Sequence, residues 1–114
     1  MEQISGDKLR GHLATMILAS LESGPTHGLD LLGRLDSAGC GLLKLKEGSL
    51  YPALYRLEAD GLVRGAWEAD TGGRRGARRR QYSLSAKGRR QLAQGREEWV
   101  AFVRVIGGIL GATT

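Results

Sequence analysis

The sequence predicts a mainly α-helical fold that contains one small β-hairpin. Apolar residues recur at helical spacing in four stretches, and Gly, Pro and Ser residues separate these stretches. A shorter stretch after residue 61 alternates between apolar and polar side chains, as an antiparallel strand does. With 114 residues, the chain is long enough for one domain with a modest core.

The first predicted helix covers residues 8–22. Leu9, Leu13, Met16 and Ile17 follow one another at spacings of three or four, and further leucines lie on a second face. A helix that is apolar on two faces is buried on two sides, so it can pack on its own domain and on a partner subunit. The run 23–25, Ser-Gly-Pro, ends it.

Two further helices are predicted over residues 27–37 and 48–60. Thr26 is the expected N-cap of the former, whose core side is formed by leucines, and Gly39 and Gly41 break the pattern. For the latter we expect Ser49 as the N-cap, with Pro52 in the first turn. Its inward stripe and terminal glycine are Leu50, Leu54, Leu57 and Gly61.

Residues 62–68 and 80–84 are the two expected strands of the hairpin. Turn-forming residues at 70–73 lie between them, and Tyr82 and Leu84 share a face of the second strand. Ser85 is the expected N-cap of a last helix, from Ala86 to about Leu110. The hairpin completes a unit over residues 1–84, and the last helix occupies residues 85–114.

The last helix carries a long apolar stripe that the rest of the chain has little surface left to cover. We expect it to form a homodimer, because exposed stripes of this size are rare on monomers. The alternative is that it folds back on the first helix of its own chain. The expected dimer contacts, or contacts to a bound effector, are Leu9, Leu13, Met16, Trp99, Phe102, Val103, Ile106 and Leu110.

The distribution of charge indicates a polyanionic partner. The net charge is +5, but residues 1–60 hold six basic and eight acidic residues, whereas residues 61–114 hold eleven and four. Five arginines lie between positions 74 and 80, at the tip of the hairpin. A solvated basic loop is the alternative to DNA contact.

Three helices followed by a hairpin is the element order of a winged helix-turn-helix protein. In this fold the third helix enters the DNA major groove, and the basic hairpin forms the wing. Arginine suits the wing because its planar fork binds phosphate in two places and fits narrow minor grooves. We therefore expect contacts to double-stranded DNA from Lys46, Arg56 and the wing residues Arg74, Arg75, Arg78, Arg79 and Arg80. The alternatives are that Lys46 is simply solvated and that Arg56 pairs with a group near Glu58.

The chain also resembles the PadR family of bacterial transcriptional regulators over nearly its whole length. The most specific piece is the run 47–58, EGSLYPALYRLE. Supporting pieces are LRG at 9–11, GPTHG at 24–28, GLV at 61–63, GGRR at 72–75 and YSLSAKG at 82–88. The wing differs from the family pattern in being unusually rich in arginine, and the single last helix resembles the compact branch of the family.

This resemblance implies a dimeric repressor that binds a palindromic operator, with its last helix paired to the first helix of the partner. It places Ser49, Tyr51, Pro52 and Tyr55 in the recognition helix, where Tyr51 and Tyr55 either contact DNA or pack. In some relatives the dimer interface forms a pore that is lined by aromatic residues and binds flat effectors. By this resemblance Trp99 either contacts an effector or packs in the core or the dimer interface.

Other classes of protein find little support in the sequence. Cys40 is the single cysteine, and His12 and His27 lie on different predicted helices, so neither a disulfide nor a metal site is expected. Catalytic motifs, cofactor-binding loops, a signal peptide and the roughly 20 apolar residues of a membrane helix are also lacking, which favours a cytoplasmic protein that is not an enzyme. A protein-interaction module with a winged fold, and a regulator without an effector, stay as alternatives.

Overall fold

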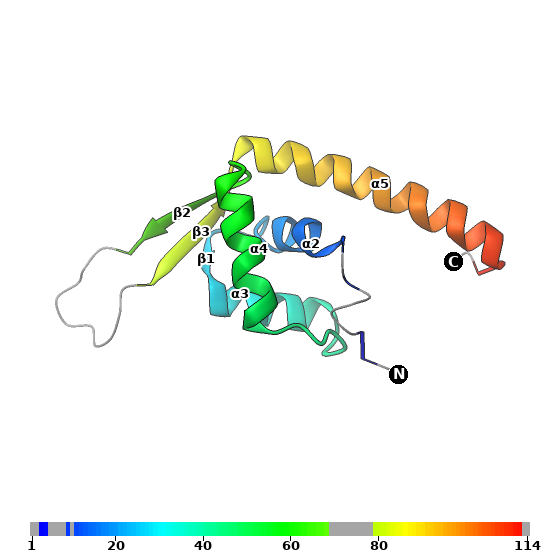
Figure 1. The fold of residues 1–114 in the computed structure, drawn as a ribbon, viewed down its shortest axis with the longest axis horizontal. Coiled ribbons are helices and arrows are strands. Elements are labelled where there is room, and N and C mark those ends of the chain that lie inside the picture. The colour runs from blue at the N-terminus through cyan, green and yellow to red at the C-terminus, as the bar shows by residue number, and fades with distance from the viewer. Residues whose placement is uncertain (1–2, 5–8, 10, 69–78, 113–114) are drawn as a thin grey trace.

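The computed structural model describes residues 3–4, 9, 11–68 and 79–112. Helices α2, α3 and α4 cluster around a small sheet, and the long helix α5 runs across them and extends beyond them (Figure 1). This arrangement confirms the predicted mainly α-helical winged helix class. The dimensions of 59 × 32 × 21 Å reflect the length of α5 and of the strands that project from the opposite side.

Helix α2 spans Leu13–Ser20, so the prediction of a continuous helix from residue 8 was wrong. Gly11 has a φ of +89° and lies in a turn just before the helix. Only glycine adopts this backbone conformation readily, which explains why the helical spacing of apolar residues did not give one uninterrupted helix. The Arg34 guanidinium donates hydrogen bonds to the carbonyl of Ser20, the last residue of α2, and to that of Gly24 beyond it, at 3.0 and 2.8 Å.

Strand β1 comprises Thr26–His27, and α3 follows as Gly28–Ala38. The prediction that Thr26 is the N-cap was wrong: His27 occupies that position, and Thr26 is a buried strand residue. The pairing of β1 with the sheet outweighs the local capping preference of threonine.

Helix α4 spans Glu47–Ala59, with Lys46 at the N-cap position, so Ser49 lies inside the first turn. Pro52 consequently lies in the second turn and not in the first, as was predicted. Its missing N–H leaves the carbonyl of Gly48 without that helical donor. Both residues are exposed, so water can hydrate this carbonyl and the proline is tolerated.

The predicted hairpin is confirmed as β2, Val63–Trp67, and β3, Arg80–Leu84. The short β1 adds an edge that the sequence did not reveal, which gives an antiparallel three-stranded sheet in the order β1-β3-β2. Val63 pairs with Leu84, Gly65 with Tyr82 and Trp67 with Arg80.

The core lies where α2, α3 and α4 meet the base of the sheet. The predicted inward leucines of α4 are buried, together with Ile17, Leu18, Leu31 and Tyr82. Leu92 of α5 completes this cluster.

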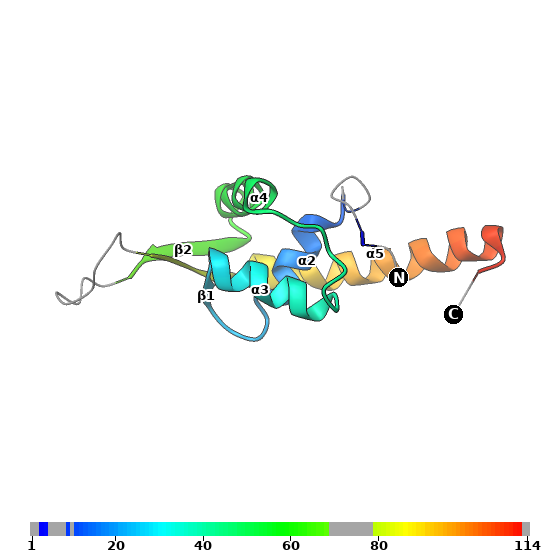
Figure 2. The same ribbon diagram turned by 90° about the horizontal axis from the view of Figure 1, so that it is seen from below.

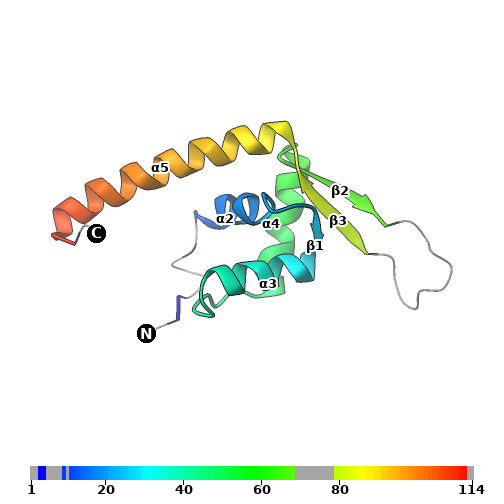
Figure 3. The ribbon, with the colours of Figure 1, turned by 180° about the vertical axis from the view of Figure 1, so that it is seen from behind.

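Helix α5 spans Ala86–Leu110, and Ser85 caps it as predicted. The Ser85 hydroxyl accepts a hydrogen bond from the Gly88 amide at 2.9 Å and lies 2.6 Å from the carbonyl oxygen of Gly61. The first half of α5 passes close to α2, while its C-terminal half extends past the body (Figures 2 and 3). The alternative, that the last helix folds back on the chain's own first helix, therefore holds for the first half of α5, whereas most of the predicted apolar stripe beyond it is exposed.

Candidate nucleic-acid interface

The outward face of α4 is the first part of the candidate interface. Because Leu50, Leu54 and Leu57 anchor one side of the helix in the core, the opposite side is turned to solvent. Figure 2 shows α4 at the margin of the molecule, beside the strands of the wing. The predicted contact residues on or beside this face, Ser49, Pro52, Tyr55 and Arg56, are all exposed.

The N-terminus of α4 adds positive charge to this face. Lys46 is exposed at the N-cap position and has an extended backbone. The unpaired amides of the first turn carry partial positive charge, which together with a lysine favours a phosphate.

Tyr51 differs from its neighbours because it is half-buried and packs against the core. A Cβ atom at Gly28 would lie only 2.5 Å from the Tyr51 ring, so this glycine lets the start of α3 approach the tyrosine. Burial raises the pKa of Tyr51, and the phenol stays protonated and able to donate a hydrogen bond. Tyr55 is 56% exposed, and its ring centre is 6.1 Å from that of Tyr51.

The wing arginines fall into two groups. Arg74, Arg75 and Arg78 lie outside the described residues. Arg79 is half exposed at the start of the wing's return strand, where its Nε atom lies 3.6 Å from Oε2 of Glu68. Arg80, by contrast, is turned toward α4.

Arg80 connects the wing to α4 through Glu58. The Arg80 Nη2 group forms an ion pair with Oε2 of Glu58, and Nε lies 3.4 Å from Oε1. The hydrogen bond to Glu58 raises the pKa of Arg80. The Arg80 guanidinium carbon is 5.2 Å from the centre of the Trp67 ring, within the range of a cation–π contact.

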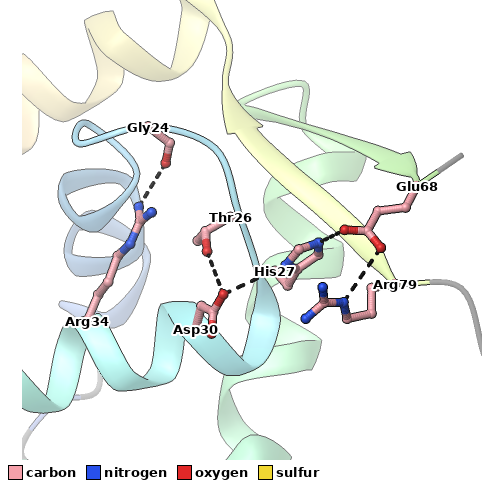
Figure 4. A network of polar contacts seen from close by, with 7 residues as sticks. All are labelled: Gly24, Thr26, His27, Asp30, Arg34, Glu68 and Arg79. Atoms are coloured by element: carbon pink, nitrogen blue, oxygen red, sulfur yellow. Dashed lines mark hydrogen bonds and ion pairs between the residues drawn. The ribbon is translucent and has the colours of Figure 1, made fainter. Parts of the chain in front are cut away.

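A second polar connection joins the wing to β1 and α3 (Figure 4). Nε2 of His27 lies 2.5 Å from Oε1 of Glu68, the same carboxylate that Arg79 approaches. Nδ1 of His27 lies 3.7 Å from Asp30, whose carboxylate also accepts a hydrogen bond from Thr26 at 3.4 Å. His27 thus occupies the N-cap position of α3 without a side-chain capping hydrogen bond, and its side chain reaches across to the wing.

Sequence reasoning missed two acidic residues, Glu58 and Glu68, which pair with Arg80 and Arg79. These pairs lie where strands β2 and β3 lead into the tip of the hairpin, a position that we call the base of the wing. Gly65, in the middle of β2, was the available signal, since glycine inside a strand marks a close approach. The identity of the approaching group required the structure.

The residues expected at a dimer or effector contact divide between core and surface. Leu9 is buried, and Leu13 and Met16 pack against the core in the single chain. The predicted contact residues on α5 are more exposed. Their exposed fractions are 50% for Trp99, 51% for Phe102, 38% for Ile106 and 72% for Leu110, and Val103 is half-buried.

An aromatic cluster lies at the point where α5 leaves the body. The Trp99 and Phe102 rings are stacked with centres 5.9 Å apart, and the His12 ring meets Trp99 edge-on at 5.2 Å.

Among the described residues, no group of three or more His, Cys, Asp or Glu side chains is placed to bind a metal ion. Within the same ranges, no helix is both long and apolar enough to span a membrane.

Comparison with known proteins gives a consistent result. The model of the transcriptional regulator PadR-like family matches residues 17–94. A solved transcriptional regulator from Clostridium thermocellum is 30% identical, with a TM-score of 0.81, and the match covers 92% of this chain and 96% of that one. A search of curated proteins gives no match.

Two further solved structures carry the family name. A PadR-like transcriptional regulator from Bacillus cereus is 27% identical, with coverage of 92% and 97% and a TM-score of 0.74. A PadR family regulator from Eggerthella lenta is 26% identical, with coverage of 91% and 86% and a TM-score of 0.77. The family comprises regulators and not enzymes, as was predicted, and the chain belongs to the PadR-like family of transcriptional regulators.

Proposed function

We propose that the protein is a homodimeric repressor of the cytoplasm that binds a palindromic operator through α4 and the wing. The observation that carries the proposal is the exposed face of α4, where Pro52 and Tyr55 lie between Ser49 and Arg56 and opposite the buried leucines. A helix held by its apolar side and free on the other can enter the major groove.

The chemistry of this face fits a division between base reading and phosphate contact. Ser49 and Tyr55 offer hydroxyl groups that donate or accept hydrogen bonds at base edges. Lys46, Arg56 and Arg79 lie exposed around them and supply positive charge for phosphates. Tyr51 is half-buried with its phenol end against Gly28, so in this proposal it offers DNA less surface than Tyr55 does.

Helix α5 supports the homodimer in this proposal. Its C-terminal half presents apolar side chains, among them Val105, Ile109 and Leu110, which are 59%, 75% and 72% exposed. A second copy would remove this surface from water, and a twofold dimer would match a palindrome. The stacked Trp99 and Phe102 rings at the same surface suit a flat effector, whose binding would release the operator.

The first test is binding of the purified protein to the DNA upstream of its own gene. Fluorescence anisotropy at several salt concentrations, against a scrambled DNA of equal length, separates specific from non-specific binding. We expect tighter binding to the native DNA and an affinity that falls steeply with salt. Equal binding to both DNAs would contradict an operator at this position, and the absence of binding to either from a folded dimer would favour a protein-interaction module.

A paired substitution tests the proposed contact surface. Arg56→Gln on α4 removes one phosphate contact and should lower the magnitude of the salt slope by about 0.9 per site. Arg90→Gln removes the same charge from an exposed position on α5 and serves as the matched control. If the two variants show the same slope, Arg56 makes no phosphate contact.

A further inference from the structure

The cluster at the base of the wing is composed of Glu58, Gly65, Trp67 and Arg80. Trp67 and Arg80 are directly paired across β2 and β3. Paired residues project from the same face of a sheet, and Glu58 reaches that face from α4. The cluster therefore joins the two elements that the proposed function requires to contact DNA together.

The Arg80 guanidinium has two partners in the chain. Its Nη2 and Nε groups face the Glu58 carboxylate, and its central carbon lies over the Trp67 ring. A Cβ atom at Gly65 would lie 2.6 Å from Nε of Arg80 and 2.7 Å from Oε1 of Glu58. Any other residue at Gly65 would therefore require these two side-chain ends to shift.

Arg80 is less exposed than its neighbour Arg79, which the proposed function assigns to phosphate contact. The Arg80 and Glu58 side chains are 25% and 29% exposed, whereas that of the adjacent Arg79 is 50% exposed. A half-buried pair is screened less by salt and is held in one geometry more firmly than a pair on the open surface. The planar fork of arginine matches a carboxylate, which a lysine would not do.

We propose that Arg80 is a positioning residue that fixes the wing against α4 through Glu58, and that it does not itself bind DNA. This inference rests on the proposed function, since it assigns how the two contact elements are held in register. It also reassigns Arg80, which the sequence had placed among the phosphate contacts. Operator binding then depends on an acidic residue, Glu58, whose negative charge would repel the DNA phosphates.

This dependence allows a test in which the two roles of Arg80 predict opposite signs. Glu58→Gln removes a negative charge near DNA. If Arg80 binds phosphate directly, Glu58→Gln should leave binding unchanged or tighten it. If Arg80 positions the wing, Glu58→Gln should weaken operator binding about tenfold, because the wing loses its fixed orientation. Glu97→Gln, which makes the same charge change at an exposed position on α5, is the matched control.

The double variant Glu58→Gln, Arg80→Gln completes a double-mutant cycle, which measures the coupling between the two residues in operator binding. We expect it to bind the operator about as weakly as Arg80→Gln alone, because both changes break the same contact. An Arg80→Gln variant that loses binding while Glu58→Gln does not, with a salt slope lowered by about 0.9, would overturn the proposal. Arg80→Lys keeps the charge but not the fork, and should resemble Arg80→Gln.

The orientation of the wing can be measured without DNA. Residual dipolar couplings of the backbone amides of β2 and β3, compared with those of α4, report the angle between the hairpin and α4. We expect Glu58→Gln to change or average these couplings and Glu97→Gln to leave them as in the wild type. Unchanged couplings in Glu58→Gln would overturn the proposal even if the wild type binds an operator, whereas changed couplings in a protein that ignores DNA sequence would contradict the proposed function alone.

Discussion

Two tryptophans with nearly equal exposure lie in opposite surroundings. Trp67 at the base of the wing is 57% exposed and Trp99 on α5 is 50% exposed. The Arg80 guanidinium lies over the Trp67 ring and is itself paired with Glu58. The ring of Trp99 stacks on Phe102, and exposed apolar side chains continue along the helix from there.

The comparison shows that exposure alone does not reveal the role of an apolar side chain. A ring covered by a cation is already partnered within the chain, and water can solvate the charges around it. An aromatic pair that continues into Val105, Ile109 and Leu110 leaves a contiguous apolar surface, which is favourable only when another surface covers it. The Trp67 ring is thus partnered within one chain, whereas the α5 surface is the one that the second copy of the proposed homodimer would cover.

The largest expected effect on stability comes from a substitution at Gly88, where the start of α5 meets the residue before strand β2. Gly88 lies in the first turn of α5, and a Cβ atom there would be 2.0 Å from the carbonyl oxygen of Leu62. Gly88→Ala must move α5 away from the end of α4, so we expect a loss of about 3 kcal/mol in the free energy of unfolding by urea.

The control for this prediction is Gly33→Ala in α3. A Cβ atom at Gly33 meets open space in the described structure, so alanine should raise the free energy of unfolding by up to about 1 kcal/mol. If Gly88→Ala is as stable as the wild type, α5 does not leave the body as the structure shows.

The next effect separates the two tryptophans directly. Trp99→Ala should weaken the dimer by about 2 kcal/mol, or roughly thirtyfold in the dissociation constant, because aromatic anchors dominate interfaces. Trp67→Ala should leave the dimer unchanged. Sedimentation equilibrium of both variants measures this difference. An equal loss of dimer in both would contradict the assignment of Trp99, and not Trp67, to the dimer interface.

The smallest effect concerns the ion pair between Glu22, which follows α2, and Arg96 of α5. Arg96 donates a hydrogen bond to Glu22 at 2.9 Å, and this bond lowers the pKa of Glu22. A carboxyl group with a lowered pKa in the folded state stabilises the fold above its unfolded pKa, and the contribution disappears as the pH falls through the folded value.

Both partners of this pair are exposed, so we expect only a slight loss of stability in Arg96→Gln at neutral pH. The difference from the wild type should vanish in acid, below the ordinary glutamate range. Thermal unfolding at neutral and acid pH measures this, and a difference that persists or grows in acid would contradict the assignment to Glu22.

Short-range patterns let the sequence determine most of the local structure. The spacing of Leu50, Leu54 and Leu57 predicted the buried side of α4, and Ser85 predicted the start of α5, because helical periodicity and capping depend on near neighbours. The same patterns indicated the winged helix order and the regulator family.

Only the tertiary structure decided how distant segments meet. Thr26 has the local signature of a helix cap, yet it pairs with Tyr82 in the sheet. Arg80 reads as one of five wing arginines, yet it turns inward to Glu58, which lies 22 positions earlier. The energies of such contacts depend on which groups the folded backbone brings within a few ångströms, and no spacing along the chain encodes that distance.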